Sequence, residues 1–205
     1  MIDDTYFVGE LNIPNTSQPA VLADLNQAID TYEREILIEL LGYSLYKEFT
    51  TAIAGETPDQ KWLDLRDGAE FTFNLGEHTI TTKWEGLINA SKRSLIAYYV
   101  YFKKVHIDMR SAAGVGGVIQ TKTENSVIVS PDKVLLRVWD KMLALYGDVE
   151  DRYQWYRYCF HKYSGPDGYA HVNDKPSAYN FLLANKADYP TWIFTPKGRL
   201  NSFGL

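Results

Sequence analysis

The chain has 205 residues, of which 45% are hydrophobic and 23% charged, and its formal net charge is −5. This length and composition indicate one folded domain over residues 1–205 and exclude a disordered polymer. The acidic balance argues against a protein whose main role is to grip nucleic acid, because phosphate binding requires a basic surface.

The cysteine count and the lack of long apolar runs indicate the cellular compartment in which the protein is made. Cys159 is the only cysteine, so no disulfide can form within the chain, and a reducing compartment is the simplest expectation. The sequence Met-Ile-Asp-Asp at the start has neither the basic region nor the apolar core of a signal peptide. No apolar run approaches the roughly 18 residues that a membrane helix needs. We therefore expect a protein that is cytosolic where it is made.

The N-terminal region is predicted to be helical after an irregular segment at 1–17. Along 18–41, apolar residues recur at steps of three and four, which is the period of a helix with one buried face. Gly42 is a suitable C-terminal stop for this helix. A second helix is expected over 44–54, ended by a further glycine.

A start signal for a short third helix follows at residues 57–60. Thr57 is expected to cap this helix, Pro58 to take its first position, and Gln60 to reach back to the cap. The helix is expected to end at Arg66.

A β-hairpin is predicted after the short helix, because the stretches 71–73 and 78–82 alternate and turn formers lie between them. A two-stranded hairpin is unstable alone and must lie on another element. Trp84 is expected to anchor it to a long central helix that opens at this tryptophan and covers 84–110. The apolar stripe of that helix is the clearest in the chain.

A glycine-rich break after the long helix is expected to be the hinge of a projecting arm at 114–129. The run 118–129 is β-prone but polar, so it buries little apolar area by itself. We expect it either to order on a partner or to be an ordinary surface loop. The candidate interface residues of this arm are Gly114, Gly116, Gly117, Thr121, Thr123 and Asn125.

The remaining helices complete a mainly α fold. Ser130 and Pro131 form a cap and first turn, and the helix that they begin is expected to reach Tyr146. Further helices are expected over 148–163 and 177–185. The sequence therefore predicts a helical bundle of about five to six helices, with a small β-hairpin and an extended arm.

The C-terminal tail, 187–205, is rich in aromatic residues and turn formers and lacks helical or strand periodicity. Its candidate interface residues are Trp192, Phe194 and Phe203. A segment of this kind buries its aromatic side chains in a groove, which belongs either to a partner or to the chain's own core.

No catalytic, metal or cofactor site is predicted. Cys159 and His161 are two residues apart in a predicted helix, so they point to different faces and do not form a zinc pair. The glycine run at 114–117 lacks both the dinucleotide-binding spacing and the Lys-Ser/Thr of a phosphate-binding loop.

Seven segments carry a family resemblance: YEREILIELLGYSLYKEF (32–49), PDQKWLDLRDG (58–68), EFTF (70–73), KWEGL (83–87), SLIAYYVYF (94–102), SPDKVLLRVWDKM (130–142) and SAYNFLLANKADYPTW (177–192). They resemble the first helical pair, the short helix, the hairpin, the long helix and the C-terminal half of one family. That family is the head–tail connector proteins, also called neck or head-completion proteins, of phages and prophages of Bacteroidetes.

The resemblance implies a non-enzymatic virion protein without cofactors. Such subunits form a homo-oligomeric ring, often a dodecamer, between the portal protein and the tail or a second connector. Packaged DNA passes through the lumen, and the ring helps to retain it. The resemblance places the protein at the virion neck, after synthesis in the bacterial host cytoplasm, without a membrane partner.

Two alternatives from other classes remain open. One is a small helical enzyme whose site is assembled from scattered tyrosines with His106 and Asp108. The other is a nucleic-acid-binding helical module, although basic pairs on a helix more often belong to a salt-bridged surface. Its candidate residues are Lys92, Arg93, Lys103 and Lys104.

Overall fold

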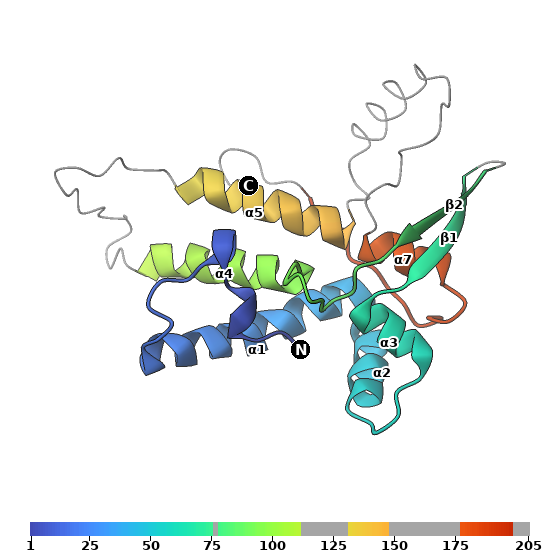
Figure 1. Ribbon diagram of the computed structural model, residues 1–205, viewed down its shortest axis with the longest axis horizontal. Coiled ribbons are helices and arrows are strands. Elements are labelled where there is room, and N and C mark those ends of the chain that lie inside the picture. The colour runs from blue at the N-terminus through green and yellow to red at the C-terminus, as the bar shows by residue number, and fades with distance from the viewer. Residues whose placement is uncertain (76–77, 112–130, 148–176, 199–205) are drawn as a thin grey trace, which may run out of the picture.

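A computed structural model describes residues 1–75, 78–111, 131–147 and 177–198 (Figure 1). Within these residues the chain forms six α-helices and one two-stranded antiparallel sheet. The predicted class, mainly α with a small β-hairpin, is therefore confirmed. The predicted arm at 114–129 and the predicted helix at 148–163 lie outside the described residues.

The element bounds follow the chain order. They are α1 Pro19–Leu41, α2 Tyr43–Ile53, α3 Gln60–Asp67, β1 Glu70–Leu75, β2 His78–Lys83, α4 Leu95–Ser111, α5 Pro131–Tyr146 and α7 Ala178–Ala184.

Three helices form the long body of the fold. Helix α4 lies between α1 and α5 and packs against both of them (Figure 1). Helices α2 and α3, the hairpin and α7 gather at one end of this body. The structure agrees to within one residue with the predicted end of α1, the predicted start of α2 and both predicted ends of α5 and α7. The apolar period and the turn-forming residues are clear at these positions.

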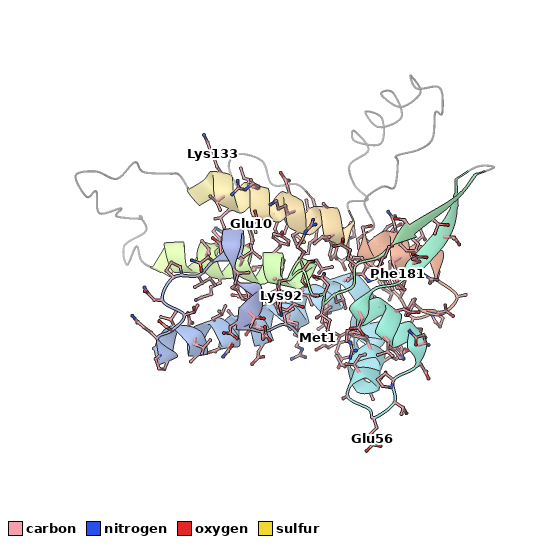
Figure 2. All side chains as sticks on the ribbon, viewed as in Figure 1. Met1, Glu10, Glu56, Lys92, Lys133 and Phe181 are labelled. Carbon is pink, nitrogen blue, oxygen red and sulfur yellow. The ribbon has the colours of Figure 1, made fainter. Side chains whose placement is uncertain are left out.

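The N-terminal segment, predicted as irregular, belongs to the core. It forms two short 3-10 turns, Asp4–Tyr6 and Gly9–Leu11, which pack against α1 and α4. Glu10 lies close to α5 (Figure 2), where its carboxylate accepts hydrogen bonds from Lys141 Nζ (2.6 Å) and Tyr98 Oη (3.0 Å). The segment's buried apolar residues are Ile2, Tyr6, Phe7, Leu11 and Ile13.

The start of α3 differs from the prediction by two residues. Asp59, not Thr57, stands at the N-cap, and Gln60, not Pro58, is the first helical residue. Asp59 has an extended ψ of 148°, so the helix cannot include the proline before it. The prediction of Thr57 as cap was therefore wrong, although the helix itself agrees with the prediction.

The predicted long helix over 84–110 was wrong at its start, because residues 84–94 are not helical and α4 begins only at Leu95. Gly86 and Lys92 have positive φ angles of 88° and 58°, which a right-handed helix does not accept. Asn89 Oδ1 accepts a hydrogen bond from the Arg93 amide at 3.0 Å, so a side chain replaces the helical backbone bond. An apolar stripe alone did not reveal this turn.

The hairpin is confirmed, and its strands pair from Glu70↔Lys83 to Leu75↔His78. Trp84 follows it and is 1% exposed, with its indole N–H donating to the Leu65 carbonyl at 3.0 Å. Its ring stacks on Phe181 at 6.4 Å between centroids. Trp84 thus anchors the hairpin to α3 and α7, and not, as predicted, by opening the long helix.

We predict that Trp84→Ala lowers the free energy of unfolding by about 3–5 kcal/mol, because it removes a fully buried ring and leaves the Leu65 carbonyl without its donor. Urea unfolding followed by circular dichroism measures the change. Tyr43→Ala is the matched control, since Tyr43 is 62% exposed, and it should change stability by less than about 0.5 kcal/mol. Equal midpoints for the two variants would contradict the assignment.

Candidate functional site

The candidate site is the groove at the C-terminal end of α1, which residues 191–198, here called the strap, occupy. The last four carbonyls of a helix have no later turn to bond with. In α1 the Ile38 carbonyl accepts from the Gly42 amide at 2.8 Å, and the next residue already begins α2. In the described backbone, no amide close in sequence donates to the other three carbonyls.

The strap supplies these missing donors from far away in the sequence. The Thr195 amide donates to the Glu39 carbonyl at 2.9 Å, and the Ile193 amide donates to the Leu41 carbonyl at 3.2 Å. The indole N–H of Trp192 donates to the Leu40 carbonyl at 2.9 Å. All four terminal carbonyls of α1 are thereby satisfied, which makes the strap a long-range C-cap.

Gly42 makes this close approach possible. Its φ of 76° turns the chain between α1 and α2. A Cβ at this position would lie 2.9 Å from the Ile193 Cβ and 3.1 Å from the Ile193 carbonyl oxygen. Gly42, which the sequence predicts as the end of the helix, therefore also leaves the space in which the strap packs.

Aromatic contacts hold the side chains of the strap. The Phe194 ring lies 5.0 Å from that of Tyr146 and 4.7 Å from that of Tyr179, and Trp192 lies 5.5 Å from Tyr179. The Tyr146 hydroxyl donates to the Thr195 carbonyl at 2.6 Å. Burial raises the pKa of Tyr146 well above its usual range, so the hydroxyl stays protonated and can donate.

Lys197 enters a cage of aromatic rings near the end of the strap. Its ammonium group pairs with the Glu39 carboxylate and lies 5.0 Å from the centroid of Tyr99, 5.8 Å from that of Trp139 and 6.0 Å from that of Tyr146. The side chain is 12% exposed. Carboxylate and ring faces together favour a cation here, and partial removal of water strengthens both interactions.

A second ion pair adjoins the cage. The Glu35 carboxylate accepts from Lys103 Nζ at 2.8 Å and from the Tyr99 hydroxyl at 2.7 Å. Burial favours the neutral form of Glu35, but these hydrogen bonds outweigh it and lower the pKa of the carboxyl group. Tyr99 thus touches both charged pairs, with its ring on Lys197 and its hydroxyl on Glu35.

Lys103, Lys104 and His106, named for the two rival functions, lie in separate contacts, while the Asp108 side chain lies outside those that the structure describes. Lys103 pairs with Glu35, and Lys104 is buried against Asp24, as expected for a salt-bridged surface. His106 is exposed on α4 beside Phe102. Across the described ranges no group of three histidine, cysteine or acidic side chains could hold a metal ion.

A surface cavity of about 650 Å³ lies between the N-terminal segment, the end of α3 and the loop after the hairpin. Its charged lining residues are Asp67, Lys83 and Glu85. The Asp67 carboxylate is already bound by Arg66. The Tyr6 hydroxyl at this cavity exchanges hydrogen bonds with the backbone of Asn89. The lining of the cavity therefore carries charges of both signs, and its residues do not form a pair of acid and base.

Of the predicted interface residues, the structure places Trp192 and Phe194 in the groove of their own chain. The arm residues at 114–125 and Phe203 lie outside the described residues, so their interface role stays a prediction. Sequence reasoning missed Thr195, Lys197 and Glu39. One signal could have pointed to them: α1 and α2 are separated by a single glycine, so α1 needs a cap from elsewhere.

Comparisons with family models, curated proteins and solved structures give no match to this chain. No described helix meets the length and hydropathy of a membrane span. The functional interpretation therefore rests on the groove, the ion pairs and the sequence resemblance.

We predict that Trp192→Phe lowers the free energy of unfolding by about 1–3 kcal/mol, because the ring is largely kept while the Leu40 carbonyl loses its donor. Ile193→Ala is the control within the strap, since this side chain is 67% exposed, and it should cost less than about 0.5 kcal/mol. Chemical unfolding of both variants measures the difference. If Trp192→Phe is as stable as the wild type, the indole does not cap α1.

The Glu35 ion pair predicts a pH dependence. A carboxyl group whose folded pKa is lowered stabilises the fold above its unfolded pKa, near the ordinary value of 4.5, and this contribution is lost as the pH falls through the folded pKa. Glu35→Gln should therefore destabilise the protein most at neutral pH, and its difference from the wild type should shrink in acid. Urea unfolding at several pH values measures this. Glu56→Gln, on the exposed α2–α3 loop (Figure 2), is the control, and a pH-independent difference for Glu35→Gln would refute the pairing.

Proposed function

We propose that the chain is a head–tail connector subunit of a phage or prophage. In this proposal it is a non-enzymatic virion protein of the neck, made in the bacterial host cytoplasm. Copies of it form a ring between the portal protein and the tail or a second connector. The ring surrounds packaged DNA and helps to retain it.

The observation that carries the proposal is the convergence of the resembling segments. The segment 32–49 forms the α1–α2 elbow, 58–68 forms α3, and 177–192 forms α7 and the first residues of the strap. Trp62, from the second of these, lies 5.8 Å from Tyr189 in the third. Segments that resemble one family in sequence thus meet in one core, as expected if the resemblance extends to the fold.

The use of polar groups supports a structural role over a catalytic one. In the described part of the chain, Glu10 and Glu35, whose pKa is lowered, and Tyr98, Tyr99, Tyr146 and Tyr189, whose pKa is raised, are hydrogen-bonded to other segments. Glu10 joins the N-terminal segment to α5, and Glu35 joins α1 to α4. The Tyr189 hydroxyl donates to the Lys61 carbonyl at 2.6 Å. Groups occupied in this way fasten segments together and are not poised to exchange protons with a substrate.

The direct test combines the purified chain with the portal protein encoded in the same phage genome. Mass photometry and electron microscopy should show the chain added to the portal as a closed ring. The portal of an unrelated phage is the control and should not bind, because ring interfaces are specific surfaces. A chain that stays monomeric and does not bind its own portal would refute the proposal.

A further inference from the structure

We infer that the strap is exchanged between subunits, so that in the assembled ring residues 191–198 of one copy occupy the α1 groove of its neighbour. This inference rests on the proposed ring. It names the partner of the groove as a second copy of this chain, and the contact as an extended segment that caps a helix.

The contacts of the strap with α1, α2 and α5 can be transferred to another copy unchanged. Its amides at 193 and 195 bond to α1, the Thr191 hydroxyl donates to the Glu48 carboxylate of α2 at 2.9 Å, and the Gly198 carbonyl accepts from Trp139 of α5 at 3.0 Å. Among the backbone bonds of the described strap, one is local, from the Trp192 amide to the Tyr189 carbonyl at 3.1 Å. The others do not depend on which chain supplies the strap.

The connection to the strap has the form of an exchange hinge. Tyr189 is anchored separately, through its hydroxyl on α3 and its ring against Trp62 and Phe181. Only Pro190 and Thr191 lie between this anchor and Trp192. The proline ring fixes φ, so the connection is both short and stiff. Only these two residues need to change conformation for the strap to reach a neighbour, and short hinges are where identical copies exchange a segment.

The strap is also attached less deeply than the core. Trp192 and Phe194 are half-buried, and Ile193 between them is 67% exposed. Segments of this kind open at a lower free energy than buried helices. Opening exposes three carbonyls and the carboxylate of Glu39, which a strap of the same sequence can bind again.

The groove selects its occupant by chemistry. The cage of Tyr99, Trp139 and Tyr146 with the Glu39 carboxylate takes an ammonium group, and the α1 carbonyls take alternate backbone amides and an indole N–H. The sequence Trp-Ile-Phe-Thr-Pro-Lys provides these donors in the required order. A second copy carries this same sequence, which is why a copy of the chain is the partner we name.

The test mixes two full-length charge-reversal variants, Lys197→Glu and Glu39→Lys. Each variant alone places like charges together in its own groove. In the mixture, the strap of the Glu39→Lys chain meets an intact Glu39 and an intact cage on the Lys197→Glu chain. Native mass spectrometry should show a species containing one copy of each, at least tenfold more abundant than the dimer of either variant alone. The absence of any mixed species would overturn the inference.

A second measurement leaves the caps of α1 and the aromatic cage unchanged. Thr191→Cys and Glu48→Cys replace two surface residues that touch, in a Cys159→Ser background, and a short bismaleimide joins them. At assembling concentrations, exchange should give covalent dimers and larger products from the doubly substituted chain. Cross-linked monomers alone, in a preparation that forms rings, would contradict exchange while leaving the proposed ring intact. The two proposals therefore fail separately.

Discussion

The end of α1 imposes the constraint on which much of this structure depends. Because α2 begins one residue after α1 ends, three carbonyls at the helix terminus have no local donor. The strap meets this requirement with two amides and one indole N–H from residues about 150 positions away, as the separation of 152 between Leu40 and Trp192 illustrates. Capping the end of α1 therefore fixes the C-terminal segment across this helix and brings Lys197 to the cage between α4 and α5.

The rest of the polar structure follows the same principle, in which charged and hydroxyl groups join elements that are distant in sequence. Lys141 and Tyr98 hold Glu10 of the N-terminal segment, while Lys103 and Tyr99 hold Glu35. Such contacts add little free energy individually at the surface, but they determine which segment lies on which helix. A subunit built in this way suits a protein whose role is to keep a fixed shape within an assembly, which is the role proposed for it.

Much of the fold could be predicted from the sequence, because an apolar period of 3.6 residues and a clear helix end are signals contained within a short stretch of chain. The end of α1 at Gly42 is an example, since its signal lies within a few residues. The turn at 84–94 could not be predicted in this way, because Gly86 and Asn89 act through contacts with Gly68 and Tyr6. The groove likewise depends on a pairing of residues far apart, so Trp192 and Phe194 could be proposed as anchors, but not Lys197 as their companion.

Hydrogen exchange at single amides tests the central claim most directly. Residues 193 and 195 lie in a segment without regular structure, so their amides have no reason to be slow unless they donate to α1. The account predicts that the Ile193 and Thr195 amides of the folded protein are protected to a similar degree as the Gly42 amide, which donates to the same helix end. Exchange of both amides at the rate of an unstructured peptide would contradict the claim that the strap caps α1.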